Sequence, residues 1–320
     1  MSEARRIVVI GGGTGVFTAL TGLKRTPHHL TAVVTMADDG GSTGQLRETF
    51  GMLPPGDVRR ALVALAEHER TLADLFTYRF EEGEGLAGHT IGNLLLTALE
   101  RMTGSFEGAV DAAAQLLRIR GEVLPVTLDN IRLKAVLEDG TEILGEHHID
   151  VPSGERARIA RIELVPAPRP NPRVLQAIAD ADAIVIGPGD LYTSLLPNFA
   201  VPGVTDAIAA SSATVALVVN VMTKFGETDQ YTARDFVDAV ERMLGTGILD
   251  AVMVNTAPPP PEAEAFYAGV RKATEPVRFT SEMFSDHAAT LIAQDLIRSD
   301  EQLIRHDPDK LAMAITSLLK

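Results

Sequence analysis

The chain has 320 residues, of which 43 are Asp or Glu and 29 are Lys or Arg, so its formal net charge is −14. Such a surface repels phosphate backbones, which argues against nucleic-acid or anionic-membrane binding. Cysteine is absent, which excludes disulfides, thiol catalysis and thiolate metal sites. A small anionic ligand stays compatible with this charge, because backbone N–H groups and a few local cations can hold it.

The first third of the chain alternates buried strands with helices. RIVVIGGGTG (6–15) predicts a strand that runs into a glycine turn and then a helix. A second strand is predicted over LTAVVTM (30–36), and Asp57 is expected to cap a helix over 58–69. Further helical patterns cover residues 71–80, 89–102 and 106–119.

From about residue 121 to residue 166 the pattern changes. The stretch 130–149 has two alternating runs around Asp139-Gly140, which is a strong hairpin signal, and ARIARIELVP adds a further strand. His147 and His148 end the second run, where they are expected to face opposite sides of a strand and not to share a metal. We therefore expect an antiparallel β insertion over 121–166.

The last third returns to the alternation of strands and helices. Its expected strands, at 182–187, 214–221 and 250–255, are uniformly apolar, as in a parallel sheet that is covered on both faces. Three strands alone would make a thin second sheet. The first and last thirds are therefore expected to build one mainly parallel, doubly wound α/β sheet in a single domain over 1–320.

Ligands of open parallel sheets lie beyond the carboxyl ends of the strands. The first loop there, GGGTG (11–15), offers successive N–H groups at a helix N-terminus and the Thr14 hydroxyl, which together suit an anion. It is not a Walker loop, and Val16 stands where G-x-G-x-x-G needs its third glycine. The alternative is a glycine turn that serves only tight strand–helix packing.

The second loop, ADDGGSTG (37–44), places two carboxylates before glycines. Asp38 and Asp39 suit Mg²⁺ or a substrate hydroxyl, and the alternative is an Asx-type turn. The loop also spells G-x-S-x-G, but a nucleophile elbow places its serine directly at the strand end. Ser42 would also need a base, His89 or His287, that only the tertiary structure could supply. We therefore favour a binding role for this loop.

The third loop, GPGDLYTSLLPN (187–198), offers a second backbone nest with hydroxyl and amide groups, which suits a phosphate, a sugar or a base edge. The alternative is a turn in which Asp190 and Asn198 satisfy backbone groups. The candidate ligand residues at this and the last strand end are Gly187, Gly189, Thr193, Ser194, Asn198 and Asn255.

Nearby basic and polar residues allow two interpretations. Arg47, Arg59 and Arg60 could offset the charge of a diphosphate, although arginine on a helix is usually solvated. For His89, as a helix cap, and for Asn93, a structural role is favoured.

Taken together, these loops resemble the gluconeogenesis factor (YvcK-type) proteins of the CofD-like superfamily, whose namesake is 2-phospho-L-lactate transferase. Arg60 departs from the family pattern, in which we expect an asparagine. The resemblance covers nearly the whole chain, in the expected order, through GGGTG, ADDGGSTGQLR, PPGDVRRAL, GHTIGNLLLTALE, GPGDLYTSLLPN, VNVMTKFGETDQYTA and IRHDPDKLA.

The resemblance implies a Rossmann-like three-layer α/β/α fold with a nucleotide across the strand ends. It implies UDP-N-acetylglucosamine as ligand and a role in cell-wall precursor supply and cell shape, without an established reaction. Carried over by residue, it assigns Gly12, Gly13, Thr14 and Gly15 to the diphosphate, Asp38 and Asp39 to the sugar or a metal, Asn198 to the nucleotide, and Tyr267 and Arg305 to the UDP-sugar.

The leading hypothesis is a cytoplasmic UDP-sugar-binding regulator that acts through a protein partner in amino-sugar or cell-wall precursor synthesis. No apolar run is long enough for a signal-peptide core or a membrane helix. The alternative is a CofD-like enzyme that moves 2-phospho-lactate from a nucleotide diphosphate carrier to a deazaflavin alcohol with Mg²⁺. In that enzyme, Asp38 or Asp39 would activate the acceptor hydroxyl. A nucleotide-dependent oxidoreductase is a weaker third hypothesis. Whether the chain catalyses a reaction, binds a metal or forms a homo-oligomer stays open.

Overall fold

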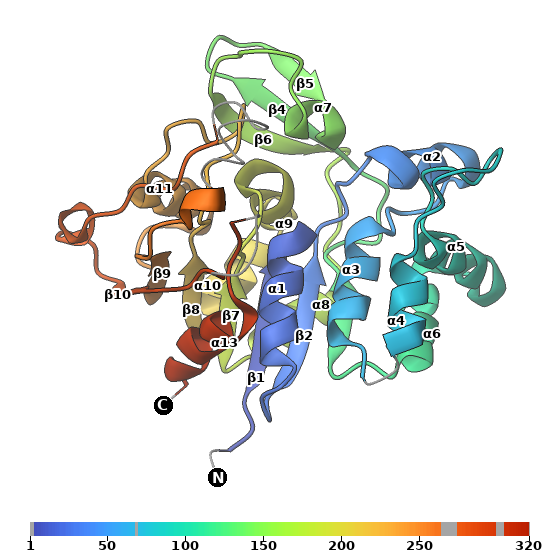
Figure 1. Cartoon of the computed structure of the whole chain (residues 1–320), viewed down its shortest axis with the longest axis horizontal. Coiled ribbons are helices and arrows are strands. Elements are labelled where there is room, and N and C mark those ends of the chain that lie inside the picture. Colours follow the sequence, from blue (N-terminus) through green and yellow to red (C-terminus); the bar gives the residue numbers. More distant parts are fainter. Residues whose placement is uncertain (1–2, 68–69, 264–273, 299–303, 320) are drawn as a thin grey trace.

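A computed structural model of the chain describes residues 3–67, 70–263, 274–298 and 304–319. Its main sheet is parallel throughout and has the order β10-β9-β8-β7-β1-β2-β3 (Figure 1). The strands are β1 (Arg6–Gly11), β2 (His29–Val34), β3 (Glu122–Pro125), β7 (Ala183–Ile186), β8 (Thr214–Val218), β9 (Ala251–Asn255) and β10 (Thr290–Gln294).

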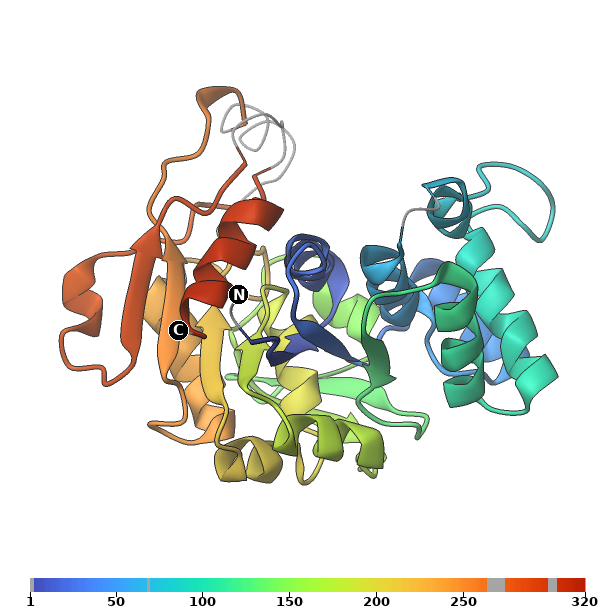
Figure 2. The same cartoon turned by 90° about the horizontal axis from the view of Figure 1, so that it is seen from below.

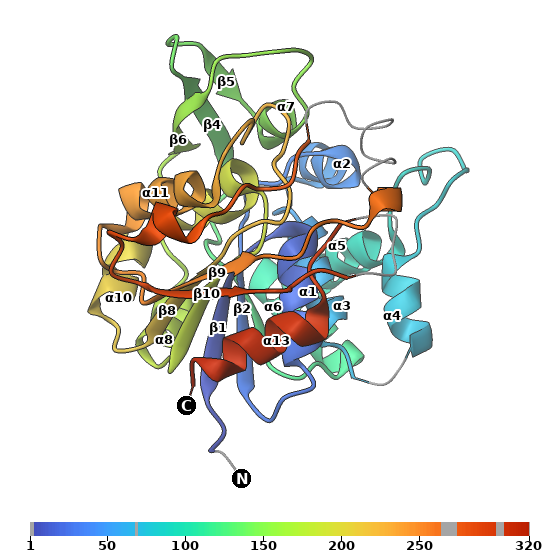
Figure 3. The same cartoon turned by 60° about the vertical axis from the view of Figure 1, so that its left-hand side comes forward.

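Helices cover both faces of this sheet, as the sequence predicted (Figure 2). The helices α1, α3, α6 and α13 pack on one face, and α8, α10 and α11 on the other. Figure 3 shows α13 beside α1. The main helices are α1 (Gly13–Leu23), α2 (Gly41–Phe50), α3 (Gly56–Leu65), α4 (Arg70–Thr77), α5 (Ile91–Thr103), α6 (Phe106–Leu117), α8 (Pro172–Ala179), α10 (Val204–Ala210), α11 (Ala233–Leu244) and α13 (Pro308–Ser317).

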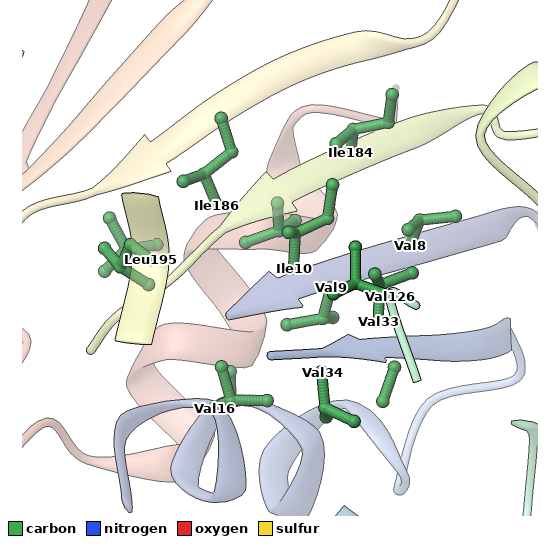
Figure 4. Close-up of a cluster of buried hydrophobic side chains, with 14 of the residues drawn as sticks. Val8, Val9, Ile10, Val16, Val33, Val34, Val126, Ile184, Ile186 and Leu195 are labelled. Atoms are coloured by element: carbon green, nitrogen blue, oxygen red, sulfur yellow. The ribbon is translucent and has the colours of Figure 1, made fainter. Parts of the chain in front are cut away.

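The core is centred on β1, which lies between β2 and β7. Its side chains after the first residue are buried because helices cover both faces of the strand. Val16 of α1 and Leu195 of η1, a π-helical turn over Leu191–Leu195, lie near its carboxyl end (Figure 4). A short helix, α9 (Leu196–Phe199), follows η1, and a 3-10 turn, η2 (Ser281–Phe284), precedes β10.

The chain order creates a switch point beside β1. The chain builds outward from β1 to β2 and β3, and then returns on the other side of β1 with β7. Ile10 pairs with Val33 on one side and with Ile186 on the other, so the carboxyl ends of the three strands lie at the same edge. Such a point is where doubly wound sheets open a ligand crevice.

A small antiparallel sheet lies beyond the carboxyl ends of the main strands in Figures 1 and 3. It has the order β5-β4-β6, and the expected hairpin turns at Gly140, whose φ is +85°. Its elements are β4 (Arg132–Leu137), β5 (Glu142–Leu144), the short helix α7 (Glu146–Asp150) and β6 (Ile159–Val165).

Three expectations about local structure are wrong. The insertion begins after Pro125 and not at residue 121, because β3 pairs with β2 and its buried side chains complete the main sheet. His147 and His148 lie in α7, because Gly145 at φ +101° ends the preceding strand. Asp57 is the second residue of α3 and does not cap it, since Pro55 holds that position.

In the described part of the chain, no helix combines the length and the apolarity that are needed to cross a membrane.

Candidate functional site

A cleft of about 770 Å³ lies at the switch point, between the main sheet and α7. It is lined by the loops after β1, β2, β7 and β8 and by residues of α2, α3, α5 and α7. The sequence-predicted site residues that line it are Gly12, Gly13, Thr14, Gly15, Asp38, Gly189, Thr193, Ser194 and Arg305. Asp39, Gly187, Asn198 and Asn255 do not line it, and Tyr267 lies outside the described residues.

The glycine loop after β1 is held close to its neighbours on two sides. A Cβ at Gly12 would lie 2.3 Å from Oδ2 of Asp57, and one at Gly15 would lie 2.3 Å from the carbonyl oxygen of Pro188. Gly13 has φ +67°, a conformation that other residues rarely adopt. The N-cap residue of α1 is Gly12, which has no side chain, so the first-turn N–H groups other than that of Gly13, which Asp57 accepts, are left for the cleft.

Asp57 lies directly under this loop, and its carboxyl group is buried. It accepts hydrogen bonds from the backbone N–H of Gly13 and from Nη1 of Arg60, the latter at 3.2 Å. Burial raises the pKa of Asp57 to about 6, and the nearby charge of Asp38 adds to the rise, while Arg60 opposes it. A carboxyl group that titrates near neutral pH therefore faces the cleft.

The two adjacent aspartates of the second loop point to different places. Asp38 lines the cleft, and its Oδ1 accepts from the N–H of Gly40 at 3.0 Å. Oδ1 of Asp39 accepts instead from the backbone N–H of His147 at 2.8 Å. Asp39 thus fastens α7 to the loop, and only Asp38 offers its carboxylate to the cleft.

A further carboxyl group comes from the small sheet. Glu146 of α7 lines the cleft, and burial raises its pKa to about 9, together with the negative charges of Asp38, Asp150 and Asp57. Lys224 opposes this rise. A divalent cation would oppose this repulsion, and oxygen ligands are those that Mg²⁺ prefers. Among the described residues, however, Asp38, Asp57 and Glu146 do not form a group of three carboxylates that lie close enough together to share one ion.

At the β8 end of the cleft, Lys224 is surrounded by carboxylates. Its Nζ contacts Asp150, lies 2.7 Å from Oδ2 of Asp190 and lies 3.1 Å from Oε1 of the fully buried Glu227. Although burial acts to lower the pKa of Lys224, these carboxylates raise it above its usual range. The three carboxylates could hold a metal by their spacing alone, but the ammonium group already lies among them. The cluster is an ion-pair network that joins α7 to two strand-end loops.

Hydroxyl and amide groups continue this network into the core. Thr193 donates to Glu227 Oε1 at 3.1 Å, so its hydroxyl is engaged by the protein. Asn198 is fully buried and donates to the carbonyl oxygens of Ser194 and Leu195, as in the turn interpretation of this segment. Asn255 bonds the backbone of the loop that follows it.

On the α5 side of the cleft, four polar side chains form a chain of hydrogen bonds. Ser42 Oγ lies 2.9 Å from Nδ1 of His89 and accepts from Nδ2 of Asn93 at 3.1 Å. Oδ1 of Asn93 accepts from Nε of Arg59 at 2.9 Å. Thr90, and not His89, caps α5. Arg59 is only 6% exposed, so the expectation of a solvated arginine is wrong at this position.

Ser42 thus has a histidine partner, yet it lacks the other parts of a catalytic triad. In the part of the chain that the structure describes, no carboxylate oxygen lies within 4.0 Å of a His89 ring nitrogen. His287 pairs with Glu241 and does not contact Ser42. Ser42 also lies in the first turn of α2 and not at a strand end, so the site lacks the geometry of a nucleophile elbow.

The contributions of Asp57, Glu146 and Lys224 to the cleft were not anticipated, whereas Arg59 had been considered as a cation for a diphosphate. Asp57 and Lys224 each lie in or next to a strand-end loop of the parallel sheet, so the strand-end rule gave a signal for both. Glu146 carried no local signal, since α7 reaches the cleft only through tertiary contacts.

Comparison with known proteins gives consistent results. The chain matches the family described as 2-phospho-L-lactate transferase CofD over residues 7–297. It is 43% identical over 314 residues to the gluconeogenesis factor of Halalkalibacterium halodurans, covering 98% of this chain and 96% of that one. It is 40% identical over 321 residues to the gluconeogenesis factor of Bacillus subtilis, covering all of both chains. The crystal structure of protein BH3568 from Bacillus halodurans matches with a TM-score of 0.93 at 42% identity, over 98% of this chain and all of that chain.

Proposed function

The chain belongs to the gluconeogenesis factors of the CofD family, and we propose that it is a regulatory protein that binds UDP-N-acetylglucosamine. We propose further that it acts on cell-wall precursor supply, and thereby on cell shape, through a protein partner in amino-sugar synthesis. The observation that carries the binding proposal is the N-terminus of α1, whose N-cap residue has no side chain and which opens on a cleft at the switch point of the sheet.

The size and lining of the cleft support this ligand class. Its volume of about 770 Å³ lies within the range of small-molecule and cofactor sites. The glycine loop would hold the diphosphate through N–H groups, with the Thr14 hydroxyl beside them. Arg305 lines the cleft and adds a positive charge, and Asp38 would accept a hydrogen bond from a sugar hydroxyl.

A magnesium ion is part of this proposal. Asp38, which lines the cleft, would offer a carboxylate ligand to it, and Asp39 would not because its carboxylate is bonded to α7. When bound, the ion would neutralise charge on the diphosphate. The protein's own carboxyl groups would then orient the sugar hydroxyls and lose the repulsion that raises their pKa.

One observation favours a second function, the CofD-like transfer of 2-phospho-lactate to a deazaflavin alcohol. A general base works best when its pKa lies near the operating pH, and burial raises the pKa of Asp57 to about 6. Asp57 lies beside Asp38, the residue first expected to activate an acceptor hydroxyl. The two functions share the cleft and differ in their ligands and in whether a group is transferred.

The deciding experiment is a calorimetric titration with UDP-N-acetylglucosamine, with and without Mg²⁺. Thr14→Val, at the cleft end of α1, is expected to weaken binding about tenfold. The matched control Thr21→Val lies on the same helix, where the hydroxyl bonds only the carbonyl of Phe17, and it is expected to bind as the wild type does. An absence of saturable binding in the wild type refutes the proposal. Product formation from a deazaflavin acceptor would establish the transferase instead.

A further inference from the structure

The α5 side of the cleft contains a group that the nucleotide-sugar proposal does not use. We name it the arginine subsite and define it as Ser42, Arg59, Arg79 and Asn93, all of which line the cleft. It lies between the first turn of α2, the second turn of α3 and the first turn of α5.

Arg59 is the centre of the subsite. It is 6% exposed, and its side chain donates to two neutral groups, Oδ1 of Asn93 at 2.9 Å and the carbonyl oxygen of Phe76 at 3.5 Å. Among the residues that the structure describes, no carboxylate oxygen lies within 4.0 Å of its guanidinium. Proteins rarely bury an arginine in this way unless it has an anion to bind.

The neighbouring positive charges make a bound anion beside Arg59 still more favourable. Burial, Arg60 and Arg79 together lower the pKa of Arg59 to about 10, while the more distant carboxylates Asp57 and Asp38 act in the opposite direction. Arg60 is paired with Asp57, whereas Arg79 donates to the carbonyl oxygen of Gly88. Two cations without a close carboxylate in the described chain therefore face the same end of the cleft.

Asn93 fixes the geometry of the subsite from both ends of its amide. Its oxygen holds Nε of Arg59, and its nitrogen donates to Ser42 Oγ at 3.1 Å. Ser42 donates its proton to Nδ1 of His89 when the neutral imidazole carries its proton on Nε2. Nη1 of Arg59 is directed at the carbonyl oxygen of Phe76, so Nη2 is the outer nitrogen for which the described residues show no acceptor, and it is the one available to a phosphate or carboxylate oxygen.

We propose that the arginine subsite binds an anionic group, a phosphate or a carboxylate, that is distinct from the diphosphate at the glycine loop. The sugar of UDP-N-acetylglucosamine carries no such group. The anion therefore belongs either to an acidic nucleotide sugar or to a second, small anionic molecule that binds beside the nucleotide. This inference does not depend on the identity of the nucleotide sugar.

Two variants and one control test the subsite. Arg59→Gln removes the guanidinium, and Asn93→Asp keeps it but places a carboxylate beside it that competes with any ligand. Arg161→Gln is the control, because it removes the same charge from an exposed pair with Glu163 on the small sheet. If Arg59→Gln fails to fold, Asn93→Asp still tests the proposal, because this variant keeps the buried side chain of Arg59.

The probes are inorganic phosphate, UDP-glucose and UDP-glucuronate, measured by calorimetry on the full chain. We expect the wild type either to bind phosphate saturably or to prefer UDP-glucuronate over UDP-glucose by at least tenfold. This binding or preference should be lost in Arg59→Gln and Asn93→Asp and kept in Arg161→Gln. A preference for UDP-glucuronate assigns the anion to the nucleotide sugar, and phosphate binding at saturating UDP-N-acetylglucosamine assigns it to a separate molecule.

Two results overturn the proposal. One is a wild type that neither binds phosphate nor prefers UDP-glucuronate, and the other is an effect that persists in both cleft variants. UDP-N-acetylglucosamine is titrated into the same variants. Its binding tests the proposed function separately, so the failure of one proposal is distinguished from the failure of the other.

Discussion

Replacing Asp57 by asparagine is expected to change how the stability of the protein depends on pH. Asp57 is buried under the glycine loop, and its pKa in the folded protein is about 6, against an ordinary value of 3.8. Because the folded state holds the proton more tightly, Asp57 favours folding below pH 3.8, and this contribution is lost as the pH rises through 6. An asparagine side chain cannot ionise, so the variant has no such loss.

The size of the effect follows from the two pKa values. A shift of about two pKa units corresponds to about 3 kcal/mol in total. Proton linkage places about 2 kcal/mol of this between pH 4.5 and pH 7.5. The free energy of unfolding of Asp57→Asn, relative to the wild type, should therefore rise by about 2 kcal/mol over that interval. The loss of the hydrogen bonds with Gly13 and Arg60 changes the free energy of unfolding of the variant by the same amount at both ends of this pH interval.

Urea denaturation of both proteins at pH 4.5, 5.5, 6.5 and 7.5, without Mg²⁺, measures this difference. Taking the difference cancels groups that do not interact with Asp57, including His306, whose buried ring has a pKa lowered to about 4 and which favours folding at high pH. Asp206→Asn, an exposed residue in the first turn of α10, serves as the control and should give a flat difference. A flat difference for Asp57→Asn as well would refute the burial argument.

Three further outcomes are expected. Gly15→Ala should lower the free energy of unfolding by about 2 kcal/mol, because its Cβ would overlap the loop after β7, whereas Gly154→Ala, which meets open space, should leave urea denaturation unchanged. Lys224→Met should lower the free energy of unfolding by about 3 kcal/mol, because it leaves three carboxylates unpaired. Adding Glu227→Gln to this variant should restore part of that stability in the same assay, and no recovery would contradict the ion-pair network. Mg²⁺ should raise the melting temperature of the wild type at pH 7.5 but not that of Asp38→Asn, and an equal rise in both would exclude Asp38 as a ligand.

The sequence predicted most of the fold because the parallel strands carry their own signal. Apolar runs such as those in RIVVIG and AIVI are buried only when helices cover both faces of the strand, and both strands are central in the sheet. The two end strands were missed for physical reasons. The strand β3 has four residues and ends in Pro125, and β10 is a partly exposed edge strand without a continuous apolar run.

The site was predictable only where it depends on strand ends. The glycine loop and Asp38 follow β1 and β2 directly, so the topology rule placed them at one edge before any contact was known. Glu146 could not be found in this way, and although Lys224 lies in the loop after β8, its ion pairs could not be found either. Their roles come from charges brought together across the fold, such as the pair of Lys224 with Asp150, 74 residues apart.

The same contacts explain why a small antiparallel sheet is inserted into a parallel fold. Its helix α7 is tied to the loop after β2 through Asp39 and to the loop after β8 through Asp150 and Lys224. These two attachments lie on opposite sides of the switch point, so α7 spans the cleft and brings Glu146 over it. A parallel sheet alone leaves such a crevice open on its outer side. The two adjacent carboxylates therefore have different roles, since Asp38 faces the cleft and Asp39 holds the helix that covers it.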